Sequence, residues 1–158
     1  MKKVVLFSIA IGIFFTACNG NFGKSSGDTD VINYYVNEQP QLERDFKMMD
    51  GKRVGVYERE YYEDGKLLKE GPLSNNEKRD GLWKSYYRDG VLWSEGSYDD
   101  GMREGKTVTY FPNGNKFYEG QFAQSKKVGV WKFWKEDGKF EKEINFDTAP
   151  EAGIKVGE

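Results

Sequence analysis

The fold is decided by residues 81–98, which read GLWKSYYRDGVLWSEGSY. Two aromatic-rich runs flank the pair Asp89-Gly90. An Asp-Gly pair between such runs is a strong hairpin signal, because glycine adopts positive φ freely and Asp tolerates it. Tyr, Trp and Val favour a half-buried pleated surface. The stretch therefore predicts two antiparallel strands joined by a two-residue turn.

The same pattern recurs along the chain. Units begin at Gly81, Gly105 and Gly129 with a spacing of 24 residues, an earlier unit begins at Gly55, and residues 50–55 belong to a degenerate unit before it. A lone hairpin is marginal in water, whereas stacked hairpins bury one another's aromatic side chains. The predicted fold class is all-β, an elongated antiparallel meander of stacked β-hairpin repeats. The expected turn glycines are Gly65, Gly90, Gly114 and Gly138.

Side-chain alternation assigns residues to the two faces of the predicted sheet. Trp83 shares one face with Ser85 and Tyr87, because strand residues two apart point the same way. In the second strand of each unit, Gly96 and Gly120 leave room for a neighbouring aromatic ring to lie over bare backbone. Longer loops, such as residues 98–104, are expected to join one hairpin to the next.

These repeats resemble the MORN repeat, in the bacterial variant found in the YwqK family of toxin–antitoxin antitoxins. The resemblance covers roughly residues 50–146 and rests on the aromatic pair, the Asp/Asn-Gly turn and the following Glu-Gly or Glu-Ile. It implies a single-sheet array used for binding or scaffolding rather than chemistry. It also implies an antitoxin or immunity role as an alternative function.

The first residues are typical of a targeting segment. Lys2 and Lys3 precede an apolar run over residues 4–15, which is too short to span a bilayer. Residues 15–18 read Phe-Thr-Ala-Cys and resemble the lipobox of bacterial lipoproteins. We interpret residues 1–17 as a lipoprotein signal peptide and expect Cys18 to carry the lipid. An ordinary signal peptide cut at the same place is the alternative.

Further boundaries follow from composition. Residues 18–30 are rich in Gly, Ser and Asp and are expected to form a flexible tether with a reach of about 20 Å. Residues 31–49 are expected to supply an N-terminal capping strand or a degenerate repeat, and residues 50–146 the repeats. Residues 147–158 are expected to be a frayed tail. The protein would then face the periplasm or cell surface, at the outer membrane in a Gram-negative cell.

Composition argues against several classes of function. The chain contains no histidine, so imidazole is excluded as a catalytic base or metal ligand. A net charge of −2 without a basic cluster argues against nucleic-acid binding. The repeated carboxylates are expected to pair with lysines on adjacent strands or to bond to backbone amides, and the loop 99–101 is at most a weak calcium site. We expect no enzymatic activity, no cofactor and no metal. The carboxylates are Glu70, Glu95, Glu119 and Glu143, and the lysines are Lys84, Lys106 and Lys132.

The aromatic side chains are the candidate binding residues. Aromatics make up 16% of the chain, and most must build the core because little else can. Those that remain exposed could contact a protein partner in the cell envelope or, alternatively, a glycan of the cell wall. The candidates for such contacts are Trp93, Trp134, Tyr86 and Tyr118.

Overall fold

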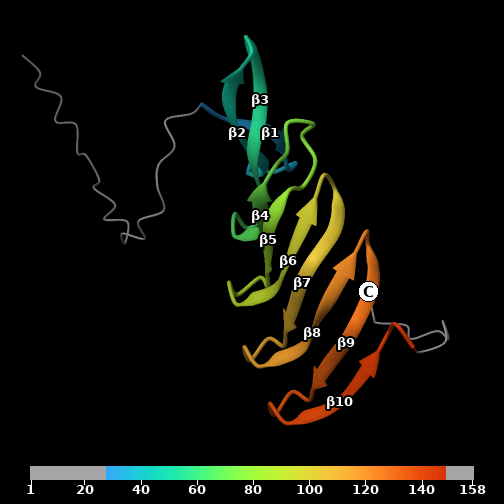
Figure 1. Ribbon diagram of the computed structural model, residues 1–158. Helices are drawn as coiled ribbons and strands as arrows, with labels where there is room; N and C mark the ends of the chain where they lie inside the picture. The colour runs from blue at the N-terminus through green and yellow to red at the C-terminus, as the bar shows by residue number, and fades with distance from the viewer. Residues whose placement is uncertain (1–27, 149–158) are drawn as a thin grey trace, which may run out of the picture.

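The computed structural model describes residues 28–148, which form one antiparallel sheet of ten strands in sequential order. The strands step along the molecule in a single twisted layer, from β1 at one end to β10 at the other (Figure 1). This confirms the predicted all-β meander. The expected leader, Cys18 and most of the tail lie outside the described residues. The strands are β1 (Thr29–Tyr34), β2 (Pro40–Met49), β3 (Lys52–Tyr61), β4 (Leu67–Pro72), β5 (Gly81–Tyr86), β6 (Leu92–Asp99), β7 (Met102–Tyr110), β8 (Lys116–Ala123), β9 (Lys126–Trp134) and β10 (Phe140–Asn145).

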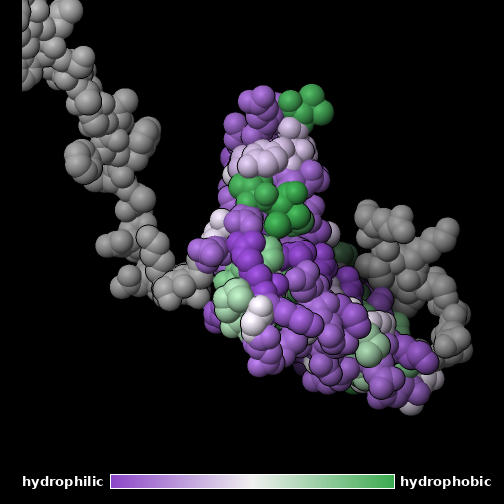
Figure 2. All heavy atoms as spheres, turned by 90° about the horizontal axis from the view of Figure 1, so that it is seen from above, coloured by the Kyte–Doolittle hydropathy of each residue, from purple (hydrophilic) through white to green (hydrophobic). Residues whose placement is uncertain are grey.

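The core lies mainly on one face of the C-terminal strands. Phe122, Trp131 and Phe133 form a buried cluster, against which partly buried aromatic and aliphatic side chains pack. Trp131 is only 1% exposed. Seen from above, the surface is largely hydrophilic and its hydrophobic residues gather in small patches (Figure 2). A single layer thus buries few residues completely and leaves both faces open to solvent.

The Asp-Gly turns inside the repeats differ from the expected two-residue form. Gly65 donates its backbone N–H to the carbonyl of Tyr62 (2.9 Å), and Tyr62 donates to the carbonyl of Lys66 (2.8 Å). Each such loop therefore has three residues, a type I turn followed by a glycine in the left-handed region. Asp64 keeps negative φ and accepts a hydrogen bond from the Lys66 N–H. The two-residue prediction was wrong because only the glycine needs positive φ here.

Two-residue turns occur instead between the repeats. Asp100 and Gly101 both have positive φ (41° and 93°), and the flanking Asp99 and Met102 pair directly. Residues 50–51 and 124–125 repeat this geometry. The longer loop expected over residues 98–104 was therefore wrong, since β6 and β7 continue almost to the turn.

The N-terminal strands repeat the hairpin in a degenerate form. In the loop between β1 and β2, Glu38 has a φ of 63° and occupies the place of the turn glycine. Tyr35 Oη donates to the carbonyl of Tyr61 (2.7 Å), just as Tyr62 Oη donates to the carbonyl of Tyr86 (2.9 Å). These hydroxyls link each hairpin to the next. β1 begins at Thr29, inside the stretch expected to be tether.

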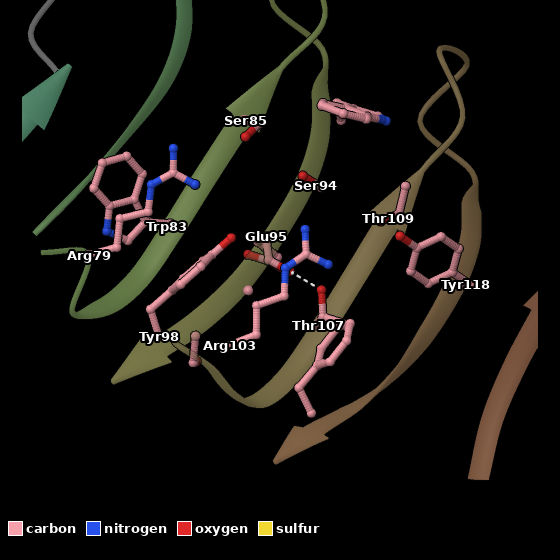
Figure 3. A pocket seen from close by; sticks show the side chains of 14 residues that line it. Arg79, Trp83, Ser85, Ser94, Glu95, Tyr98, Arg103, Thr107, Thr109 and Tyr118 are labelled. Carbon is pink, nitrogen blue, oxygen red and sulfur yellow. Dashed lines mark hydrogen bonds between the residues drawn. The ribbon is translucent and has the colours of Figure 1, made fainter. Parts of the chain in front are cut away.

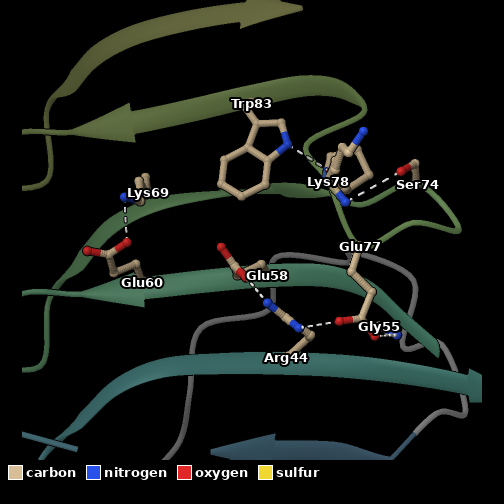
Figure 4. Close-up of polar contacts among 10 residues, drawn as sticks. Arg44, Gly55, Glu58, Glu60, Lys69, Ser74, Glu77, Lys78 and Trp83 are labelled. Carbon is tan, nitrogen blue, oxygen red and sulfur yellow. Dashed lines mark hydrogen bonds and ion pairs between the residues drawn. The ribbon is translucent and has the colours of Figure 1, made fainter. Parts of the chain in front are cut away.

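A loop between β4 and β5 joins the N-terminal strands to the middle of the sheet. Its Glu77 carboxylate accepts hydrogen bonds from Arg44 and from the Gly55 N–H (Figure 4). Its Lys78 ammonium lies 2.9 Å from the Asp100 carboxylate in the β6–β7 turn. Only two residue pairs join β4 to β5, so these side-chain contacts add links between the strands on either side of that short ladder.

Candidate functional site

One face of the sheet carries a row of glycines covered by tryptophans, and we call it the tryptophan face. The Trp83 ring lies over Gly71, and the Trp131 ring lies over Gly120 so closely that an added Cβ would clash with either ring. Trp83 Nε1 donates to the carbonyl of Pro72 (2.8 Å). Bare glycine backbone thus gives each indole a flat surface. The expectation of a ring over Gly120 is confirmed.

The middle glycine of this row lacks such a ring. Gly96 pairs with Thr107, which occupies the place of Trp83 and Trp131 in its repeat. The Thr107 hydroxyl donates to the carbonyl of Glu95 (3.1 Å), and Gly96 remains partly exposed. The expectation of an aromatic ring over Gly96 was wrong. A hollow of about 90 Å³ lies here instead.

Aromatic side chains line both sides of this hollow (Figure 3). On one side Trp83 and Tyr98 meet edge to face, with ring centroids 6.4 Å apart. On the other side lie Phe122 and Tyr118. The remaining lining consists of serine and threonine residues together with Trp93, Gly96, Glu95, Arg79 and Arg103. The site therefore combines ring faces with hydroxyl groups.

Cations accompany the aromatic rows at the same 24-residue spacing as the repeats. The Arg79 guanidinium lies 4.3 Å from the centroid of the Trp83 ring, and Arg103 lies 5.0 Å from that of Phe122. The next member is Lys127, over Trp131. Such cation–π contacts stabilise exposed rings modestly. Arg79 and Arg103 both border the hollow.

Arg79 and Arg103 differ from the other described arginines in forming no ion pair. Between residues 28 and 148, neither guanidinium lies within ion-pair distance of a carboxylate. The other arginines of that segment each have an acidic partner: Arg44, Arg53, Arg59 and Arg88. The hollow is thus bordered by two guanidinium groups that form no ion pair within residues 28–148, although Glu95 also contributes to its lining and accepts a hydrogen bond from Tyr110 Oη.

The opposite face carries the repeated glutamates, and we call it the carboxylate face. Glu70 accepts a hydrogen bond from Tyr86 Oη (2.9 Å), and Glu95 accepts one from Tyr110 Oη (3.1 Å). Glu119 pairs with Lys116 (2.8 Å) and more distantly with Lys106 (4.0 Å). In the described segment, Lys84 and Lys132 form no ion pair. The expected pairing with those two lysines was wrong because tyrosine hydroxyls hold Glu70 and Glu95 and Lys116 holds Glu119.

Burial and carboxylates raise the pKa values of tyrosines on the carboxylate face. Burial of its hydroxyl is the main cause that raises the pKa of Tyr57 to about 12, and the negative charge of Glu70 is the second. Burial and the Glu70 hydrogen bond also raise the pKa of Tyr86. The pKa of Glu119 is lowered, chiefly by its hydrogen bond from Lys116. The hydroxyls of Tyr57 and Tyr86 stay protonated at neutral pH and can therefore donate hydrogen bonds.

The four candidate aromatics divide between the two faces. Trp93 and Tyr118 border the hollow, and Trp93 is 44% exposed. Tyr86 lies on the carboxylate face, with its hydroxyl engaged by Glu70. Trp134 lies under the Lys116 ammonium, 4.8 Å from its ring centroid. The structure therefore brings two of the four together.

Three residues that border the hollow were not predicted from the sequence: Arg79, Arg103 and Thr107. Aligning the repeats already shows Thr107 where the neighbouring units have Trp.

The described segment offers neither a metal-binding cluster nor a membrane-spanning helix. Residues 28–148 contain no group of three or more Cys, Asp or Glu arranged to hold a metal ion. In the same stretch no helix is long and apolar enough to cross a membrane. Among the described residues, the hollow on the tryptophan face is therefore the candidate functional site.

The repeats also match a known family. The family described as the MORN repeat variant matches residues 56–75, 79–100, 103–124 and 127–148. The four matches cover more than half of the chain and follow the structural repeats from β3 to the end of β10. No curated protein matches the chain. The predicted likeness to MORN repeats is thereby confirmed, and the chain belongs to the MORN repeat variant family.

Proposed function

We propose that this protein is a bacterial lipoprotein whose MORN repeats bind a protein partner at the cell envelope. MORN repeats are interaction modules rather than enzymes, in keeping with the open sheet. The observation that carries the binding proposal is the hollow on the tryptophan face, bordered by aromatic rings and two cations. Concave sites with rings and a few polar groups are typical of recognition surfaces.

The membrane anchor is supported by sequence alone. Residues 15–18 follow an apolar run, and Cys18 is the single cysteine of the chain. Lipidation of Cys18 would hold the sheet near the membrane. One acyl chain gives marginal binding, whereas several chains give stable anchoring.

Lipid labelling in the native host tests the anchor. Cells are fed an alkyne-tagged palmitate, and the wild-type protein is compared with Cys18→Ala. The proposal expects label on the wild type and none on the variant. Unlabelled wild-type protein would show that the leader is an ordinary signal peptide and that the envelope partner must be sought elsewhere.

Site-specific photocrosslinking in cells tests the protein-binding role. A photoreactive residue replaces Trp93 beside the hollow or, as the matched control, Lys132 on the carboxylate face. The proposal expects one discrete crosslinked protein from position 93 and none from position 132. Equal, diffuse crosslinking from both positions would contradict a specific partner.

A glycan ligand is the second candidate, favoured by the exposure of Trp93 beside hydroxyl side chains. Aromatic side chains stack on sugar rings, and hydroxyls hydrogen-bond to them. Pull-down with purified peptidoglycan tests it, with Trp93→Ala as the comparison. Retention on peptidoglycan that depends on Trp93 would favour this candidate over a protein partner. The antitoxin association implied by the YwqK resemblance stays a prediction.

A further inference from the structure

The hollow on the tryptophan face corresponds to a missing side chain. In the flanking repeats an indole covers the row glycine, with Trp83 over Gly71 and Trp131 over Gly120. In the middle repeat the small side chain of Thr107 stands beside Gly96, with its hydroxyl oxygen 3.1 Å and its Cβ 3.5 Å from where a Cβ of residue 96 would stand. The sheet register is unchanged, because Gly96 and Thr107 pair directly. The backbone there has the form that holds a ring elsewhere in the same sheet.

The walls of the hollow suit an aromatic occupant. Trp83 and Tyr98 lie on one side of the gap and Phe122 lies on the other. In the C-terminal repeat the corresponding ring, Trp131, contacts Phe122 edge to face with centroids 5.1 Å apart. A ring inserted above Gly96 would meet comparable neighbours. Aromatic pairs of this kind contribute beyond the area that they bury.

The charges around the hollow suit a carboxylate next to that ring. Arg79 and Arg103 border the site and have no carboxylate partner in residues 28–148. Figure 3 shows the Arg103 side chain lying between Tyr98 and Thr107, at the edge of the gap. Guanidinium groups bind carboxylates with two parallel hydrogen bonds and also stack on aromatic faces.

We propose that the hollow over Gly96 receives an aromatic side chain of the partner protein, with an adjacent carboxylate bound by Arg79 and Arg103. The partner's ring takes the place that Trp83 and Trp131 occupy in the flanking repeats. This inference rests on the proposed role as a protein-binding module and adds the chemistry of the segment that is recognised.

The test uses the full-length protein solubilised in detergent and titrated calorimetrically with capped tripeptides. Glu-Trp-Glu is the probe, and Glu-Ala-Glu and Lys-Trp-Lys remove the ring and the carboxylates in turn. The inference expects Glu-Trp-Glu to bind at least about tenfold more tightly than either of the others, as expected where ring and charge act together. Equal binding of the three peptides, or no binding of Glu-Trp-Glu, overturns it.

The decisive variant is Thr107→Trp, which fills the gap with the residue that the flanking repeats use. The new indole can donate to the carbonyl of Ser97, as Trp83 donates to that of Pro72. The inference expects a fold at least as stable as the wild type and a loss of Glu-Trp-Glu binding of at least about tenfold. Retained binding would overturn it.

A second variant keeps the inference testable if Thr107→Trp fails to fold. Arg79→Gln combined with Arg103→Gln removes both charges and is expected to weaken Glu-Trp-Glu binding to the level of Lys-Trp-Lys. Arg88→Gln is the matched control, because Arg88 lies outside the hollow.

Binding of a chitin oligosaccharide in place of every peptide would overturn the inference in favour of a glycan. If the crosslinked partner of position 93 is captured equally by Thr107→Trp, the proposed function stands and this inference fails.

Discussion

Two regions of the tryptophan face cover a buried glycine in different ways. In the C-terminal strands the Trp131 indole lies over Gly120 and contacts other rings. In the N-terminal strands the stem of Arg44 lies over Gly55, and its guanidinium pairs with Glu58 (2.6 Å) and Glu77 (2.9 Å). The same backbone therefore accepts either an indole ring or the methylene stem of an arginine, since both are apolar and long enough to lie across the glycine.

The difference determines how each region depends on its surroundings. Ring contacts and apolar burial are insensitive to salt, whereas ion pairs near the surface are screened by it. In the middle repeat neither an indole ring nor an arginine stem lies over Gly96, because Thr107 is too short to extend across it. We therefore expect the three regions to respond differently to mutation, pH and salt.

The largest effect is expected from Trp131→Ala. Trp131 is 1% exposed and contacts three rings, so its removal opens a cavity and costs about 3–5 kcal/mol of the free energy of unfolding. Urea denaturation measures the loss. Val130→Ala on the same strand is the control; Val130 is exposed and its replacement should cost less than about 1 kcal/mol. Similar losses for both variants would contradict the difference in packing.

A smaller effect is expected from Gly120→Ala. The added methyl group clashes with the Trp131 ring, and overpacking of this kind costs about 1–3 kcal/mol. Gly96→Ala is the matched comparison, because its methyl group would lie 3.1 Å from the Thr107 hydroxyl oxygen and 3.5 Å from Thr107 Cβ, much looser contacts than those with the Trp131 ring at Gly120. Thermal unfolding of the two variants should separate them clearly. A larger loss of stability in Gly96→Ala than in Gly120→Ala would contradict the claim that the space above Gly96 is less crowded than that above Gly120.

Alkaline pH should weaken the sheet through the tyrosines of the carboxylate face. The pKa of Tyr57 rises from 10 to about 12 on folding, so the folded state favours the protonated hydroxyl. Its stabilising contribution is complete below pH 10 and is lost as the pH rises toward 12. Tyr61, Tyr86 and Tyr110 have raised pKa values in the same direction. The urea midpoint measured from pH 9 to 12 should fall, and less steeply in Glu70→Gln. A midpoint independent of pH would argue against this coupling.

The smallest effect is expected from salt on the N-terminal strands. Arg59 pairs with Asp45 through two hydrogen bonds of 3.0 Å, and Arg44 pairs with two carboxylates. Raising NaCl from 0.05 to 1 M should reduce the stability of β2 and β3 by up to about 1 kcal/mol. Hydrogen exchange resolves this by strand, and β9 and β10 serve as the internal control. Equal loss of protection at both ends would show that ion pairs do not distinguish the regions.

The repeats and their faces could be predicted from the sequence because they depend on spacing. Glycines recur every 24 residues, tryptophan occupies the same place in two of the repeats, and alternation puts Trp131 and Gly120 on one face. The turns could not be predicted in the same way. Asp89-Gly90 and Asp100-Gly101 are the same dipeptide, yet the first belongs to a three-residue loop and the second to a two-residue turn. The register of the flanking strands selects between them.

The candidate site could be predicted only in part. Tyr118 and Trp93 were chosen for their aromatic character, and the structure places both beside the hollow. Tyr86 has the same character but donates its hydroxyl to Glu70 on the other face. Arg79 and Arg103 recur at the repeat spacing, but the sequence does not show that they border the hollow or that they form no ion pair within the described strands.

The sequence alone determined that this chain forms an all-β array of hairpins, because a repeated pattern of aromatics and turn residues can bury its rings in few other ways. The tertiary structure decided which loops are tight, which tyrosines donate to carboxylates and where a ring is missing. Those features depend on contacts between residues on neighbouring strands, whose register arises only when the sheet assembles. The hollow over Gly96 is the clearest case, since one Thr in place of Trp becomes a site only between two aromatic neighbours.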